Sequence, residues 1–493
     1  MATKKDLVEA YSFSRRRLVT AFVSGAPGGR EVEPARPGRA VVGGIALAVL
    51  LLAGAAVLKI IGSPVDLDPG KAQLISEKES GADYVLISTQ GEDDLRLRPV
   101  INITSAMLLL GADIEPLVVP RDKLTDLDPG EQIGILQAPA TPPPVSGLIG
   151  SGWTACSGEV GGSSVGLRVR VSRDPQVVPT PDVSLVVRAV SDDPDEDGTV
   201  YLISESARGA DDAQPRAYSY EIPGDPGGVL GNVTSGGESQ AVDVPAQWLT
   251  TFPAGGPLAL STFGLTARQL GSPFPGRPGD GPFSDAVVGD VVEIGDAGDQ
   301  RYVLTADGSA VRLDDFAARV YAGVLPKKFD REPIDGGNAL PADLEQDLPS
   351  LSNASWPPAP TLEPPSGEYC SYLRAGTGLT PSVVLARAVP GGPASAVGIE
   401  ADDRLPTVDA GAGAFVRSGG WSDAQAPTRV LIDDRAIAYG VAGQDEQDNL
   451  GYAAVEAEVV PDSWLELFDP GVLLSIEAAQ CPPTSVAPDE PCA

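Results

Sequence analysis

The chain has 493 residues, with 35 Lys and Arg against 68 Asp and Glu, no His, four Cys, 57 Gly and 47 Pro. A net charge of −33 argues against a nucleic-acid partner, and the absence of His excludes triads, general bases and metal ligands that depend on it. The many Gly and Pro residues predict frequent turns and few long helices.

The first segment, residues 1–40, is basic and predicts one amphipathic helix followed by a linker. Thr3 caps a helix over residues 4–23, and Gly25 with Pro27 ends it. The helix carries an apolar stripe of Leu7, Tyr11, Leu18 and Phe22, and a basic cluster of Arg15, Arg16 and Arg17. Two interpretations stand level on these residues: the helix lies on an anionic inner leaflet, or it docks on a cytoplasmic partner.

An uncharged apolar run follows at residues 41–58. Eighteen residues at about 1.5 Å each span about 27 Å, which predicts a transmembrane helix over residues 41–61. The forty-residue leader is too long for a signal peptide, and the small-residue sequence at 53–55 lies inside the run, so we expect an uncleaved anchor. Eight Lys and Arg but only four Asp and Glu precede the run, which places the N-terminus in the cytoplasm. The acidic remainder, with all four Cys, is then extracytoplasmic.

The remaining chain predicts an α+β region of two to four domains. Short apolar runs bounded by Gly, Asp and Asn predict strands at residues 84–88, 199–203, 302–305 and 429–432. Helical patterns are expected at residues 104–110 and 313–320.

An internal repeat, V-P-x-x-(W/K)-L-x-x-(F/L)-x-x-G, occurs at residues 119–130, 244–255 and 460–471. Pro suits the first turn of a short helix, the apolar pair packs inward, and Gly is expected to end the helix. A companion pattern of strand, turn, strand and helix occurs at residues 84–111 and 302–323. Repeated small modules predict a scaffold and not an active site.

The sequence holds no motif typical of nucleotide or redox chemistry. Gly70-Lys71 lacks the earlier glycine of a P-loop, and no C-x-x-C occurs. Residues 193–198 read D-x-D-x-D-G, the first half of a calcium loop, but its twelfth position is Ser204 and not Glu. We favour an acidic turn there. We therefore predict no catalytic residue, no cofactor and no metal site.

The four cysteines allow three pairings. Cys481 and Cys492 are close in sequence and suit a local bridge in a Pro-rich tail. A bond between Cys156 and Cys370 would instead close a loop of more than two hundred residues and tie distant modules together.

An ordered set of motifs resembles the EccB family, the single-span core membrane component of actinobacterial type VII secretion systems. The set runs over nearly the whole chain: F-S-R-R-R-L-V-T-A-F at 13–22, R-P at 36–37, L-R-P-V-I-N-I-T-S-A-M-L-L-L-G at 97–111, Trp153 with Cys156, N-L-G-Y at 449–452, V-P at 460–461 and E-A-A at 477–479. Residues 134–139 (G-I-L-Q-A-P) depart from the family's G-I-P-G-A-P.

The resemblance implies an α+β fold with a cytoplasmic amphipathic helix, one transmembrane helix and an elongated extracytoplasmic region. That region would hold a central β-rich domain and four small α/β repeat modules, with a Cys156–Cys370 disulfide and a Cys481/Cys492 pair as an extra bridge. The expected boundaries are 1–40 (docking helix and linker), 41–61 (transmembrane helix), 62–150 (first module), 151–230 (part of the central domain and start of the second module), 231–350 (second and third modules), 351–400 (linker returning to the central domain), 401–480 (fourth module) and 481–493 (Pro/Cys tail).

The resemblance also implies a single-pass plasma-membrane protein that is a structural subunit of a type VII secretion complex and bridges its membrane core to an extracytoplasmic multimer. The implied partners are a multi-span channel subunit, an FtsK-like motor ATPase and further copies of the chain, which favours docking for the N-terminal helix. The expected docking residues are Phe13, Arg15, Arg16, Arg17, Leu18 and Phe22. Weak ATP hydrolysis is ascribed to the family, so a membrane-anchored ATP-hydrolysing enzyme is one alternative. A stand-alone extracytoplasmic ligand sensor is another.

Overall fold

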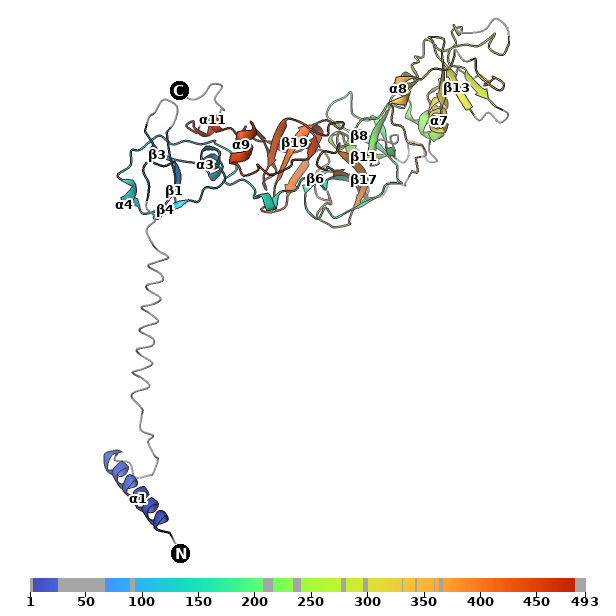
Figure 1. Cartoon of the computed structure of the whole chain (residues 1–493). Coiled ribbons are helices and arrows are strands. Elements are labelled where there is room, and N and C mark those ends of the chain that lie inside the picture. The colour runs from blue at the N-terminus through green and yellow to red at the C-terminus, as the bar shows by residue number, and fades with distance from the viewer. Residues whose placement is uncertain are drawn as a thin grey trace. The chain divides into compact units, whose positions relative to one another are not determined.

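The computed structural model describes residues 3–24, 67–88, 94–206, 216–233, 241–275, 281–295, 300–329, 331–341, 344–358, 360–362 and 367–483. The chain divides into two compact units, Met1–Leu67 and Asp68–Ala493. In the first unit the described residues form one helix, α1 (Lys4–Ser24), which confirms the helix predicted there (Figure 1). Its first turn is closed by the Asp6 carboxylate, which accepts a hydrogen bond from the Thr3 backbone N–H at 2.9 Å.

The predicted transmembrane run lies outside the described residues, as do Gly25 and Pro27. Within the part of the chain that is described, we find no helix with the length and apolar character needed to cross a membrane.

The second unit contains four small sheets with one shared connectivity. In each, three consecutive strands pair in antiparallel fashion, a helix follows, and a fourth strand pairs parallel with the first. The segment that forms the first sheet runs through β1 (Gln73–Glu77), β2 (Asp83–Ile87), β3 (Arg96–Pro99), helix α3 (Ile103–Leu110), β4 (Leu117–Val119) and helix α4 (Arg121–Leu124). The second contains β8 (Leu185–Val190), β9 (Val200–Ser206), β10 (Arg216–Ile222), α5 (Pro226–Val233), β11 (Val242–Pro245) and α6 (Ala246–Leu249), followed by η3 (Leu260–Phe263).

The third and fourth sheets repeat this order. The third contains β12 (Val291–Ile294), β13 (Gln300–Leu304), β14 (Ala310–Leu313), α7 (Asp315–Val324) and β15 (Ile334–Asp335), followed by α8 (Pro349–Ser352). The fourth contains β19 (Ala414–Gly419), β20 (Thr428–Ile432), β21 (Ile437–Val441), α9 (Gln444–Asn449), β22 (Val459–Pro461), α10 (Asp462–Leu465) and β23 (Asp469–Pro470), followed by α11 (Ile476–Ala479). The strands and helices predicted from sequence are confirmed as β2, β9, β13, β20, α3 and α7.

The V-P…G repeat forms the return path from the fourth strand to the third. After β4, β11 and β22 the chain makes one short helix and then pairs in parallel with β3, β10 and β21 respectively. The final glycines, Gly130, Gly255 and Gly471, donate their N–H groups to carbonyl oxygens of those strands at 2.9, 2.9 and 2.7 Å.

These glycines do not end the helices, contrary to the sequence-based expectation, because α4, α6 and α10 stop before them. A Cβ atom there would collide with the side chain of Arg98, Tyr220 or Tyr439 on the third strand. Gly is therefore needed for close approach of the chain to its own sheet.

A six-stranded sheet is assembled from two distant parts of the chain, in the order β18-β6-β5-β16-β17-β7. Its strands are β5 (Trp153–Val160), β6 (Ser163–Val171), β7 (Val177–Pro179), β16 (Gly367–Arg374), β17 (Ser382–Ala388) and β18 (Arg404–Val408), with η1 (Val145–Gly147) before them. The second and third sheets are inserted between β7 and β16. One face of the six-stranded sheet packs with the second and fourth sheets in a single core. Two further cores join the second sheet to the third and the first sheet to the fourth.

Candidate functional site

Among the described residues, the most prominent features are interfaces at which one sheet packs on another, called joints below. The described residues contain no group of three or more Cys, Asp or Glu side chains arranged to hold a metal ion. The carboxylates of the acidic turn at residues 193–198 accept hydrogen bonds from nearby backbone groups. The Asp193 carboxylate accepts from the Asp195 N–H at 3.0 Å, and the Asp197 carboxylate accepts from the Ser191 N–H at 3.3 Å. These contacts fit the acidic turn that we favoured over a calcium loop.

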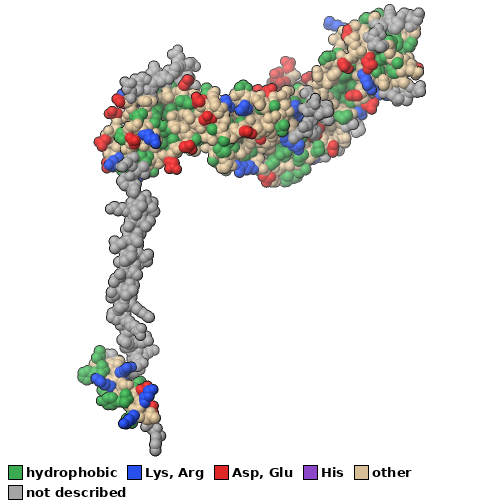
Figure 2. All heavy atoms as spheres, in the orientation of Figure 1, with side chains coloured by type: hydrophobic (Ala, Val, Ile, Leu, Met, Phe, Trp, Pro, Cys, Tyr) green, Lys and Arg blue, Asp and Glu red, His purple; other side chains and the backbone are tan. Residues whose placement is uncertain are grey.

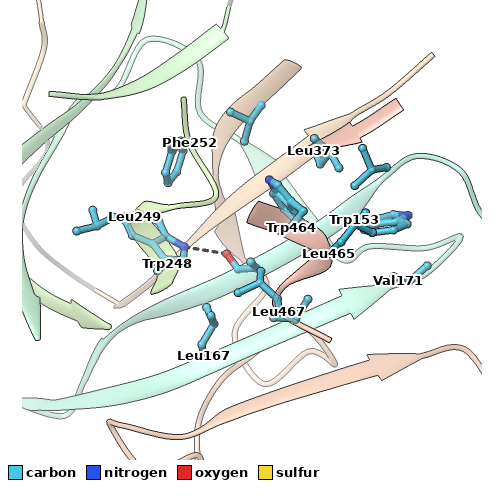
Figure 3. Close-up of a cluster of buried hydrophobic side chains, with 14 of the residues drawn as sticks. Trp153, Leu167, Val171, Trp248, Leu249, Phe252, Leu373, Trp464, Leu465 and Leu467 are labelled. Atoms are coloured by element: carbon cyan, nitrogen blue, oxygen red, sulfur yellow. Dashed lines mark hydrogen bonds between the residues drawn. The ribbon is translucent and has the colours of Figure 1, made fainter. Parts of the chain in front are cut away.

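The joint with the six-stranded sheet is built around two repeat tryptophans, Trp248 on α6 and Trp464 on α10 (Figure 3). Both indoles are fully buried. Trp248 Nε1 donates to the Ala155 carbonyl of β5 at 2.8 Å, and Trp464 Nε1 donates to the Thr251 carbonyl at 3.0 Å. Each indole therefore buries a large apolar area while its polar N–H is satisfied by a neighbouring element. The second and fourth sheets are thus fixed on the six-stranded sheet and to each other.

The first copy of the repeat does not make such a joint. Lys123 occupies the tryptophan position and is exposed, whereas Leu124 beside it is buried as Leu249 and Leu465 are in the other copies. The leucine position is thus buried in all three copies, whereas the preceding position is buried only where it is Trp.

The disulfide between Cys156 and Cys370 is present and fully buried. The two residues are direct cross-strand partners on β5 and β16. The bond therefore joins neighbouring strands of one sheet, whereas the sequence had led us to expect a bond between distant modules. It closes the chain segment that contains the second and third sheets. Cys481 is also disulfide-bonded, and Cys492 lies outside the described residues.

Helix contacts form the two remaining joints. At the crossing of α5 with α7, a Cβ added to Gly323 would lie 2.7 Å from Val229 Cα and 2.9 Å from the Gly228 oxygen, so the two backbones touch. At the joint of the first and fourth sheets, the Asn449 amide donates to the Leu108 carbonyl at 2.7 Å and so satisfies the last turn of α3. Neither joint was predicted from the sequence, although glycines and the N-L-G-Y motif lie at them.

One half-buried acid lies near the joint of the second and six-stranded sheets. Burial raises the pKa of Glu205 on β9 to about 7, opposed by the charge of Arg374 on β16 and aided by that of Asp182. One of its oxygens is buried with no hydrogen-bond partner among the described residues. Burial thus disfavours the charged carboxylate at this site relative to water.

The expected docking residues lie on α1, whose surface shows apolar and basic side chains together (Figure 2). Leu18 and Phe22 line a hollow along the helix with Tyr11, Val19 and Arg15. Phe13 is 62% exposed and lies outside that hollow. Phe22 is 92% exposed, which is rare for so large an apolar side chain. The structure thus brings part of the expected set together on one face.

Comparisons with known proteins agree on one family. A family model described as "Type VII secretion system ESX-1, transport TM domain B" matches residues 1–488. A protein named ESX-1 secretion system ATPase EccB1, from Mycolicibacterium smegmatis, is 27% identical over 475 residues, covering 90% of this chain and 87% of its own. The protein of the same name from Mycobacterium tuberculosis H37Rv is 26% identical over 503 residues, covering 97% and 94%.

Solved structures share the fold. A chain of an intact ESX-5 inner membrane complex aligns with a TM-score of 0.54 at 19% identity, covering 100% of this chain and 98% of that one. The EccB3 dimer from the ESX-3 core complex aligns with a TM-score of 0.54 at 18% identity, covering 83% and 100%. Because the family model matches nearly the whole sequence, this chain belongs to the EccB family of type VII secretion proteins.

Proposed function

We propose that the protein is a structural subunit of a type VII secretion membrane complex and links the membrane core to an extracytoplasmic multimer. The observation that carries this proposal is the construction of the joints. Sheets of the second unit meet through buried indoles, a glycine crossing and a capped helix end, all of which hold position and perform no chemistry. The similar chains of known structure come from an ESX-5 inner membrane complex and an ESX-3 dimer, which supports assembly in a membrane complex and self-association.

The four small sheets are, in this proposal, four repeat modules around the six-stranded sheet. Their shared strand order supports this, as does the common pairing of the returning chain with the third strand. Residues 41–61 would cross the plasma membrane once, with the N-terminus in the cytoplasm. The excess of Lys and Arg before the run supports that orientation. The Cys156–Cys370 bond also supports it, because disulfides persist outside the cytoplasm.

Helix α1 is proposed to dock on the cytoplasmic side, against the multi-span channel subunit and the FtsK-like motor ATPase. Leu18 is 69% exposed and Phe22 is 92% exposed, so the helix alone leaves its apolar stripe uncovered. A partner groove would bury that stripe, and Arg15, Arg16 and Arg17 beside it would pair with acidic groups of the partner.

Affinity purification of the tagged full chain from gently solubilised membranes tests this function, with the particle sized and its components identified by mass spectrometry. We expect a very large particle that contains the motor ATPase and the multi-span protein. Phe22→Asp should release those partners, whereas Ser12→Asp on the same helix should not. A lone monomer or dimer in mild detergent would contradict the proposal and favour a stand-alone sensor.

ATP hydrolysis is the second candidate, because the names of the similar mycobacterial proteins include ATPase. The sequence contains no P-loop and no His to serve as a general base. Turnover by the purified chain that survives removal of contaminating ATPases, and that falls on substitution of a residue in this chain, would establish the enzyme.

A further inference from the structure

A cleft of about 600 Å³ lies against the six-stranded sheet, between β6, β18 and the loop that joins β17 to β18. Its size is that of a small-ligand site. None of the joints described above uses it.

Strand alternation places two arginines in this cleft. Leu167, Val169 and Val171 of β6 point into the core shared with the second and fourth sheets. Arg168 and Arg170, between them, therefore point to the opposite face, where both line the cleft. Two guanidinium groups thus stand side by side on one strand of a chain whose net charge is −33.

The charges in the cleft are not balanced. Arg170 pairs with the Asp409 carboxylate at 3.0 Å and also donates to the Asp174 carbonyl at 3.1 Å. Arg168 donates through Nε to the Ser395 carbonyl at 3.1 Å, and within the described part of the chain no carboxylate lies within 4 Å of it. The nearby Glu368 carboxylate is already engaged by the Ser395 hydroxyl at 2.7 Å and by the Ala396 N–H.

The guanidinium of Arg168 and the lining of the cleft together indicate which class of ligand could bind there. A guanidinium presents two parallel N–H groups that match a carboxylate in bidentate fashion. Pro393, Val397 and Val408 supply an apolar wall beside it. The ligand chemistry is therefore a carboxylate attached to a small apolar group.

We propose that this cleft is a carboxylate-binding site in which Arg168 receives the anion. The free C-terminus of a peptide and a short-chain organic acid share this chemistry. The inference concerns the second unit and does not depend on assembly with secretion partners.

The test is calorimetric titration of the purified full chain with three probes: acetyl-Ala-Ala-Val with a free carboxylate, the same peptide as its C-terminal amide, and butyrate. We expect saturable binding of the free-acid peptide, and binding weaker by about tenfold or more for the amide, because a charge-assisted pair is lost. Binding of butyrate comparable to that of the peptide acid would assign the site to small organic acids. Butyrate without effect would assign it to chain termini.

Variants locate the binding. Arg168→Gln should weaken binding of the acid probe by about tenfold or more, and Arg168→Lys should fall between it and the native chain. Arg173→Gln removes the same charge from a residue that does not line the cleft, and should bind as the native chain does. Acid and amide binding alike, no saturation by either acid, or unchanged binding in a folded Arg168→Gln would overturn the proposal. The comparison of acid with amide uses the native chain, so it decides the matter even where a variant fails to fold.

Discussion

Replacement of Trp248 by Ala should detach the second sheet from the six-stranded sheet. The Trp248 side chain is completely buried. Its ring packs edge-to-face on Phe252, with the ring centroids 5.0 Å apart, and its Nε1 donates to the Ala155 carbonyl at 2.8 Å. The same repeat position in the first sheet, Lys123, is exposed. The chain therefore offers its own matched control.

The expected cost follows from these contacts. Removal of a buried Trp side chain costs about 3–5 kcal/mol in lost transfer energy and cavity formation. The Ala155 carbonyl would still accept from the Ser371 hydroxyl at 3.3 Å, so the lost hydrogen bond adds only about 1 kcal/mol. We expect a total of about 4–6 kcal/mol for Trp248→Ala. Lys123→Ala should change stability by less than about 0.5 kcal/mol.

Amide hydrogen exchange of the full chain, resolved by peptide, measures this loss at the joint itself. Peptides from β5 and β11 should exchange about a thousandfold to ten-thousandfold faster in Trp248→Ala, since about 1.4 kcal/mol corresponds to each factor of ten. Trp248→Phe should give an intermediate value. An acceleration below tenfold, or an equal effect of Lys123→Ala, would refute the view that the repeat tryptophan holds the joint.

Three further perturbations test the other joints. Gly323→Ala places a Cβ 2.7 Å from backbone of α5 and should cost about 1–3 kcal/mol, seen as faster exchange in α5 and α7, whereas Gly231→Ala, with open space around it, should be neutral or stabilising. Burial raises the pKa of Glu205 to about 7, so the folded state keeps a proton that the unfolded chain has released above about pH 4.5. The free energy of unfolding should fall by about 1–2 kcal/mol from pH 5 to pH 8, and a pH dependence unchanged in Glu205→Gln would contradict this. Replacement of Cys156 and Cys370 together by Ala should cost up to about 5 kcal/mol by the loop-entropy model, and non-reducing peptide mapping should link the two thiols in the native chain.

Local elements could be predicted from sequence because their causes are local. The N-terminal helix follows from apolar spacing and an N-terminal cap, and the strand at residues 84–88 follows from β-branched and aromatic residues bounded by turns. The repeat was also visible, since the same backbone path needs the same Val-Pro start and the same distant Gly each time. Its last residue was misinterpreted. Gly is needed there because a side chain on another strand lies where a Cβ atom would be. No local sequence pattern reveals such a contact.

The six-stranded sheet could not be predicted in detail, because its strands come from segments separated by the second and third sheets. Cys156 and Cys370 are 214 residues apart in sequence and neighbours across two strands. The Asn449 amide similarly finds the carbonyl of Leu108, 341 residues earlier. No sequence motif singles out Arg168, because the cleft that it lines exists only where the loop between β17 and β18 packs beside β6. Such contacts are set by tertiary packing and not by periodicity.

The repeat combines two physical requirements that vary independently. Val-Pro and the final Gly close a small sheet on itself, and they occur in the first, second and fourth sheets alike. The Trp position serves contact with a neighbour, and it is Trp only in the two sheets that pack on the six-stranded sheet. The third sheet closes through Glu345 without the motif, meets its neighbour through α7 and buries a separate core of its own. Variation at one position of the repeat thus distinguishes the second and fourth sheets, which join the six-stranded sheet, from the first, while the path that closes each small sheet stays the same.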